Sequence, residues 1–183
     1  MKRHSYLSMT AALLAALSFS ALTLAASTAQ IDTRVQGALQ RFYAQDEHHR
    51  ELTQKAAAVL VFPRVTKAGA GVAGEFGEGA LQVQGKTVGY YKVTGASVGA
   101  TLGAARRSEV ILFMTDAARD KFMNSHDWTI GADAGVAVAH KGAGGEYDNE
   151  TLSKPIVAFV FGEKGLIADA SLEGAKISKL PAQ

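Results

Sequence analysis

The residues of this chain that could do chemistry are few, and their surroundings weaken most of them. Gly69, Gly71 and Gly74 have the spacing of a dinucleotide-binding fingerprint. Such a site needs a strand, a turn and a helix, followed by an acid about 20 residues later. Here more glycines follow where the helix should begin, and no acid lies near Thr94. We therefore interpret this run as a glycine-rich strand and expect no nucleotide cofactor.

A second candidate is a metal site in a short segment rich in acids and histidines. On a helix its Glu47 and Glu51 share a face and His48 lies beside Glu51, so two or three ligands could converge. The segment lacks the two histidines at i,i+4 that zinc hydrolases use. A solvated helix face is the favoured interpretation, and we expect no metal cofactor. The segment consists of Asp46, Glu47, His48, His49 and Glu51.

Other catalytic chemistry has little support. The chain has no cysteine, which excludes thiol nucleophiles, disulfides, zinc–cysteine sites and thioether lipid anchors. Asp133 interrupts a strand of small and apolar residues, and we interpret it as a paired structural carboxylate or a residue at the sheet's rim. No Ser/His/Asp order or carboxylate pair can be assigned, although such sites are spatial arrangements. We expect a protein that is not an enzyme.

Basic residues near the ends of predicted strands are the best candidates for a binding site. Arg64 and Lys67 follow the first predicted strand, and Arg106 and Arg107 lie together at the end of another. Arginine forks and exposed lysines are the groups that recognise phosphate. We therefore predict that these four residues bind an anionic lipid headgroup. The alternative, a set of unrelated solvated charges, carries equal weight.

The N-terminal segment has the pattern of a secretory signal peptide. Lys2 and Arg3 precede an uncharged stretch over 6–24, and small residues follow it. We predict that residues 1–29 are removed, with cleavage after Ala25 or Ala26 as alternatives and a retained membrane anchor as the competing interpretation. The mature protein is then exported, periplasmic or secreted, and either free or peripheral to a membrane. Without cysteine it is not a lipoprotein.

Removal of the leader would change the electrostatic character of the chain. The full sequence has 19 Lys and Arg against 17 Asp and Glu, and the leader contains two of the bases and none of the acids. A neutral mature body argues against nucleic acid as the partner, since that partner needs a dense basic face. Attraction to an anionic membrane must then come from local clusters, at about 1 kcal/mol per basic residue.

The elements that must position these residues follow from periodicity. Apolar residues recur at helical spacing from Ile31 to Phe42, and 46–55 predicts a second helical segment, continuous or kinked, with a Glu51–Lys55 pair. A helix packed on the domain is favoured over one lying on a membrane. The apolar positions of the first helix are Ile31, Val35, Ala38, Leu39 and Phe42.

After Lys55 the period becomes two, which predicts strands. One short helix interrupts them, from an N-cap at Asp116 to Met123, and Gly85-Lys86 is a candidate turn. The fold class is therefore α+β: an N-terminal amphipathic helix or helix pair (30–56), then a strongly curled, mostly antiparallel, glycine-rich, barrel-like sheet with one short inserted helix (57–183), together forming one domain. The predicted strands are 58–62, 69–76, 79–84, 87–93, 96–104, 108–114, 128–139, 155–161, 165–171 and 173–177.

Two of these strands, over 97–104 and 130–138, have very small residues at alternate positions. Repeated glycine in a strand indicates tight curvature or close approach of another element. A ligand lying on the small face is the alternative. Tyr90, Tyr91 and Trp128 could lie at a lipid interface, but packing in the core or rim is favoured.

A series of motifs in fixed order resembles the SYLF domain, also called the Ysc84-type actin-binding domain. The likeness covers about residues 55–178, nearly the whole mature body. Its residues are Val59-Leu60-Val61-Phe62-Pro63, Lys67-Ala68-Gly69, Gly77-Glu78-Gly79, Ser97-Val98-Gly99 with Gly103, Val110 to Phe113, Trp128 with Gly131 and Asp133, Gly165-Leu166 and Ser171-Leu172-Glu173-Gly174.

The resemblance implies a lipid-binding module of the cell envelope. Eukaryotic members are associated with phosphoinositide membranes and some with actin, whereas exported bacterial members are usually called lipid-binding. Tyr90-Tyr91-Lys92 replaces a tryptophan and proline segment of the eukaryotic pattern, so the chain is closer to the bacterial branch and actin is disfavoured. The alternative is an envelope structural, interaction or stress protein that binds an unknown protein through the helix or the glycine-rich face.

Overall fold

The computed structural model describes residues 26–131, 135–139, 147–162, 165–166, 172 and 174–181. Two helices precede a sheet of seven strands, and two short helices lie between later strands. Because the described residues begin at 26, the predicted leader (1–29) lies almost wholly outside them. The elements are α2 (Thr28–Tyr43), α3 (His48–Lys55), β1 (Ala58–Val83), β2 (Lys86–Phe113), α4 (Asp116–Asn124), β3 (Asp127–Thr129), β4 (Ala137–Val138), α5 (Asn149–Leu152), β5 (Ile156–Gly162), β6 (Gly165–Leu166) and β7 (Lys176–Lys179).

Two very long strands, β1 and β2, dominate the fold. They form one antiparallel ribbon whose pairing runs from Val83 with Lys86 to Ala58 with Phe113. The turn is formed by Gln84 and Gly85, whose φ angles of 50° and 74° are those of a type I′ hairpin. It lies one residue before the predicted Gly85-Lys86 turn. Strands predicted as separate segments are thus joined, because the chain bends without leaving the ladder.

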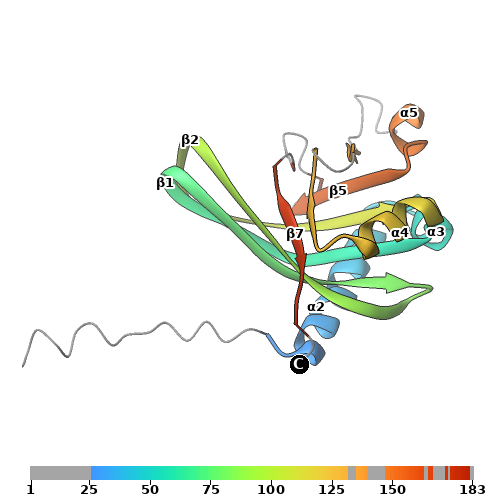
Figure 1. Ribbon diagram of the computed structural model, residues 1–183. Coiled ribbons are helices and arrows are strands. Elements are labelled where there is room, and N and C mark those ends of the chain that lie inside the picture. Colours follow the sequence, from blue (N-terminus) through green and yellow to red (C-terminus); the bar gives the residue numbers. More distant parts are fainter. Residues whose placement is uncertain are drawn as a thin grey trace, which may run out of the picture.

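Both strands bend together midway between the turn and the Ala58–Phe113 pair, so that the ribbon folds back over itself (Figure 1). Glycine makes this close approach feasible. A Cβ at Gly79 would lie 2.0 Å from the carbonyl oxygen of Val61, and one at Gly77 would lie 2.8 Å from that of Arg64. Any side chain at these positions would push the two halves of β1 apart. The predicted α+β fold with a strongly curled, mostly antiparallel sheet is confirmed.

The remaining strands extend the ribbon on both sides. The main path of the sheet is β3-β7-β2-β5-β4, with β1 on β2 and β6 on β5. Only β4 and β5 pair in parallel among the described strands. One face of the sheet packs Leu60, Ile111 and Phe113 with Trp128 and Phe122. We call this the inner face; the opposite, outer face is covered by α2.

Helix α2 packs as its periodicity predicted. Ser27 caps it by accepting a hydrogen bond from the backbone N–H of Gln30, and a break around Asp46 separates it from α3. The predicted Glu51–Lys55 ion pair is present at 2.7 Å. No helix within the described ranges is both long and apolar enough to cross a membrane. The buried residues of α2 are the five predicted ones, Ile31, Val35, Ala38, Leu39 and Phe42.

Three local expectations need correction or fall outside the structure. Helix α4 is capped by Thr115, whose hydroxyl accepts from the N–H of Ala118, rather than by Asp116. The predicted strand over 128–139 is not continuous, because the chain turns at Gly131 with a φ of 95° and β4 then pairs with β5. Asp133 and the side chains over 97–103 lie outside the described part of the molecule.

Candidate functional site: an arginine-rich face beside helix α2

A β-bulge in β1 positions the first arginine of the site. Pro63 and Arg64 together oppose the single residue Ser108 of β2, because the register changes between Phe62 and Val65. Proline has no N–H to donate to the ladder, so a bulge is a favourable place for it. The extra residue turns Arg64 outward, where it is exposed.

Helix α2 brings a second arginine to the same place. Arg41 donates a hydrogen bond from Nη2 to the hydroxyl of Ser108 at 3.3 Å and from Nη1 to the Gly37 carbonyl at 3.3 Å. The Ser108 hydroxyl in turn donates to the carbonyl oxygen of Pro63 at 2.9 Å. This chain of contacts fixes the last turns of α2 against the bulge.

The arginines of this region surround two adjoining cavities. One, of about 250 Å³, is lined by Arg41, Arg64 and Arg106 with the Pro63 and Ser108 just described. The other, of about 130 Å³, is lined by Arg34 and Arg64 together with other residues. Those residues include Phe76 and Glu78, and Glu78 is the one acid in the two linings. We call Arg34, Arg41, Arg64 and Arg106 the outer arginine face.

The charges of the outer arginine face are available to a ligand. All four residues are exposed, and none of them forms an ion pair with a described carboxylate. Planar guanidinium groups can bind phosphate oxygens through two parallel hydrogen bonds. The geometry therefore suits a phosphate or another small anion at a solvent-accessible surface.

Arg107 has a different environment, although it adjoins Arg106 in the sequence. Strand alternation places it on the inner face, where its Nη2 lies 2.8 Å from Glu75 Oε2 and its Nε 2.7 Å from Glu109 Oε1. Its side chain is only 13% exposed. Burial raises the pKa of Glu109 to about 7 against the pull of Arg107, and Glu109 Oε2 has no hydrogen-bond partner among the described atoms.

The structure thus divides the four residues predicted from sequence. Arg64 and Arg106 line one cavity. Arg107 also borders this cavity, but its guanidinium group forms ion pairs with two carboxylates. Lys67 is half-buried and pairs with Ala105 in the ladder. Because Val65, two positions earlier in β1, packs in the inner core, strand alternation places Lys67 on the inner face as well. Their role in lipid binding stays a prediction.

Sequence reasoning did not include Arg34 and Arg41 in the site. A signal for them was present, because the α2 periodicity places both residues away from the apolar stripe. What the sequence lacked was the position of α2 on the sheet, which depends on packing between residues far apart in the chain.

The histidine-rich segment is divided between a cavity, which Asp46, His48 and Glu51 line, and the core, where His49 is buried. His48 is exposed and lies 2.8 Å from Asp46, which raises its pKa, whereas His49 is buried, stacks on Phe42 at 3.8 Å and contacts the Tyr147 hydroxyl. Within the described ranges, no three His, Asp or Glu residues are grouped to hold a metal ion.

Other sequence interpretations can be located in the fold. Residues 69–74 lie within β1, so their interpretation as a strand rather than a nucleotide loop is confirmed. Trp128 and Tyr91 are buried in the inner core. Tyr90 donates a hydrogen bond to Asp32 at 2.8 Å, which ties β2 to α2. All three aromatic residues therefore have structural contacts, as favoured.

Comparison with known proteins finds a family likeness over the C-terminal half of the chain. No curated protein matches it. Residues 94–181 match a family model described as Ysc84, Las17-binding protein actin regulator. The match includes Arg106 and Arg107 and runs from the middle of β2 beyond the end of β7. The SYLF resemblance seen in the sequence is confirmed over this part of the chain, which is similar to the Ysc84-type family.

Proposed function

We propose that this protein is a non-catalytic module that binds anionic phospholipid surfaces peripherally through its outer arginine face. The observation that carries this proposal is the grouping of four exposed arginines around two adjoining cavities, with no carboxylate of the described chain paired to them. The likeness of residues 94–181 to the Ysc84-type family supports a binding role rather than catalysis.

The magnitude of the attraction can be bounded. A basic residue close to an anionic membrane contributes about 1 kcal/mol, so four arginines acting together could contribute roughly 4 kcal/mol, or about a thousandfold in affinity. The full chain has a net charge of only +2. Long-range attraction by the whole protein is therefore weak, and binding must depend on this local group.

The positions of the arginines on the outer arginine face also favour phosphate binding. Arg64 borders both cavities, so one bound surface could engage both at once. Arg41 is already oriented by Ser108 and the α2 backbone, which lowers the conformational entropy that it would lose on binding. Glu78 in the smaller cavity opposes the same anion, so the larger cavity is the better phosphate site.

A protein partner is the second candidate function. The family description names Las17 binding and actin regulation, and exposed parts of α2 or the glycine-rich ribbon could serve as a protein interface. Actin remains the disfavoured partner, because we also propose from the leader pattern that the protein is exported. Retention by envelope proteins without any binding to vesicles would favour this second candidate.

Flotation with vesicles tests the proposal directly. Vesicles of phosphatidylcholine with phosphatidylglycerol should bind the protein, and pure phosphatidylcholine vesicles should bind it much less. Replacing Arg64 and Arg106 together by alanine should lower the partition coefficient by up to about thirtyfold, at about 1 kcal/mol per residue. Raising the salt concentration should weaken binding of the unchanged protein, because salt screens exposed charges.

A charge-matched control is available in Lys86 and Lys179, both exposed and without an ion pair among the described residues. Replacing this pair by alanine removes the same charge away from the outer arginine face and should change binding by less than about threefold. Equal losses in the two double variants would show that net charge, not this surface, controls binding. Absence of flotation at low salt would contradict the proposed function itself.

A further inference from the structure

The bent ribbon exposes apolar side chains beside the outer arginine face. Val72 is 61% exposed and Phe76 50% exposed, although the sheet has ample core on both sides. Their positions in β1 alternate with the buried Ala73 and Gly77, and the ladder is regular from Val72 to Phe76. Both side chains therefore project from the same side of the strand, about 13 Å apart along it.

Nothing in the described structure covers the space between these two residues. Gly74 lies midway on the same side, and a Cβ built there would meet no atom within 4 Å. Two other large apolar side chains of the described chain are exposed, Val88 and Met123. Val88 lies near the turn of the ribbon and Met123 lies on α4, so neither extends this surface.

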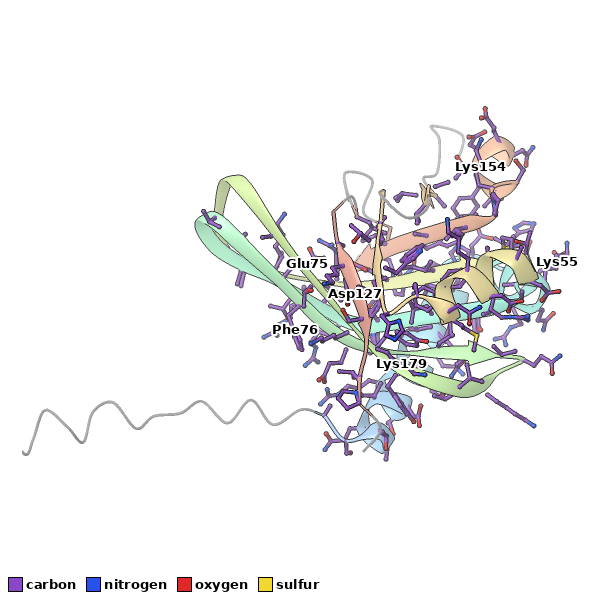
Figure 2. The ribbon with its side chains drawn as sticks, in the orientation of Figure 1. Lys55, Glu75, Phe76, Asp127, Lys154 and Lys179 are labelled. Carbon is purple, nitrogen blue, oxygen red and sulfur yellow. The ribbon has the colours of Figure 1, made fainter. Side chains whose placement is uncertain are left out.

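The apolar side chains and the arginines lie on one side of the ribbon. Phe76 lines the smaller cavity with Arg34 and Arg64. Figure 2 shows Phe76 on the side of the ribbon opposite Glu75, the carboxylate that binds Arg107 on the inner face. The bend of the ribbon projects beyond the strands and helices that pack around the rest of it (Figure 1). A flat partner could therefore reach this surface.

We propose that Val72, Gly74 and Phe76 form a shallow membrane-insertion surface, entering the upper acyl region of an anionic bilayer while the outer arginine face holds the lipid phosphates. This inference rests on the proposed lipid-binding function and adds the element that penetrates the membrane. A bilayer suits the site because it presents phosphates and hydrocarbon at adjacent depths, and the chain presents arginine and apolar groups in the same relation.

The backbone limits how deeply this surface can enter. Strand β1 pairs only with β2 in the described structure, so its other edge carries backbone N–H and C=O groups that need water. Such groups are costly in hydrocarbon. Side chains therefore enter while the strand itself stays at headgroup depth. Phenylalanine is well suited to this boundary, and its exposed ring loses contact with water there.

Single-cysteine labelling tests the insertion, because the chain has no native cysteine. Val72→Cys and Phe76→Cys, each coupled to an environment-sensitive fluorophore, are compared with Val88→Cys and Met123→Cys, whose native residues are also exposed and apolar. On vesicles containing phosphatidylglycerol, labels at 72 and 76 should shift to the blue, brighten severalfold and be quenched by lipids brominated near the headgroup end of the chain. Labels at 88 and 123 should change little.

The open position at Gly74 supplies a second measurement without a label. Gly74→Leu should raise the vesicle partition coefficient about threefold or more, and Gly74→Glu should lower it about tenfold, because apolar area is gained in one case and a charge must be desolvated in the other. A Cβ at this position meets no atom within 4 Å, and thermal unfolding checks that each variant folds.

The two proposals fail in different ways. If flotation persists but labels at 72 and 76 stay in a water-like environment and both Gly74 variants bind equally, insertion is wrong and surface binding stands. If the unchanged protein does not float with anionic vesicles, the proposed function is wrong and the insertion with it. Equal blue shifts at all four labels would also contradict a defined insertion surface.

Discussion

Two adjacent arginines project from opposite faces of the β1–β2 ribbon and differ in whether carboxylates pair with them. Arg106 projects from the outer face into a cavity shared with Arg41 and Arg64 and has no ion pair with a described carboxylate. Arg107, its neighbour in the sequence, projects from the inner face, where Glu75 and Glu109 bind it at 2.8 and 2.7 Å. The same residue type provides a ligand-accessible charge on one face and a structural charge on the other.

This difference shows that the number of basic residues in a segment is a poor measure of its capacity to bind anions. A charge that already satisfies two carboxylates cannot attract a phosphate without giving up those contacts. The inner cluster has two carboxylates and one guanidinium, so its excess charge is negative when both acids are ionised. Burial is the main cause of the raised pKa of Glu109, and the negative charge of Glu75 adds a smaller contribution in the same direction.

The largest expected effect comes from removing Arg107. Arg107→Ala would leave two carboxylates without their cation in a region that is largely buried, and breaking such a cluster typically costs about 3–5 kcal/mol. Arg106→Ala, at an exposed site, should change the free energy of unfolding by less than about 0.5 kcal/mol. Urea denaturation measures both. Similar losses in the two variants would remove the distinction between the faces.

The next effect is a pH dependence of stability that originates at Glu109. Its pKa is raised by burial to about 7 in the folded protein, above its ordinary value. The folded state therefore holds this proton more tightly, and the resulting stability is complete at pH 4 and is lost as the pH rises through 7. The contribution is on the order of 1–3 kcal/mol.

Glu109→Gln tests this pH dependence because glutamine resembles the neutral acid in shape. Between pH 5 and pH 8 the unchanged protein should lose more stability than the variant, as measured by chemical denaturation at each pH. Glu51→Gln, on the exposed surface of α3, is the control and should leave the difference between the two pH values unchanged. A parallel decline in unchanged and Glu109→Gln protein would show that other groups cause it.

The smallest effect should be a gain in lipid affinity on removing Glu78. This acid lines the smaller cavity with Arg34 and Arg64, where it repels a bound phosphate. Glu78→Gln removes this charge and keeps the size of the side chain. Binding to anionic vesicles should rise by about twofold to fivefold, whereas Glu150→Gln on α5 should have no effect. A decrease would place the bound lipid elsewhere.

Much of the fold could be predicted because its signals are local. The α2 stripe follows directly from residues three and four apart, and strand pattern identified most segments of β1 and β2. Their union was not predictable in the same way, because a glycine-rich bend resembles a strand end in sequence. The approach of Gly79 to Val61 depends on how far the ribbon curls, which no window of neighbouring residues contains.

The candidate site was less accessible to sequence reasoning, for two different reasons. Arg106 and Arg107 were grouped as neighbours, although the period of two in a strand already predicts opposite faces for them. Glu109, two residues further, shares the face of Arg107, so that ion pair also had a sequence signal. Arg41 had none of this kind, because its place beside Ser108 requires the packing of α2 against β2.

The tight turn at Gln84 and Gly85 also has a consequence for the order of folding events. Pairs beside this turn close very short loops, whereas the pairing of Ala58 with Phe113 closes a long one, and loop closure costs more entropy as loops lengthen. The ribbon should therefore zip outward from the turn. Gly85→Ala, which strains a φ of 74°, should mainly slow refolding in stopped-flow experiments. Ala58→Gly, at the last pair to form, should mainly accelerate unfolding.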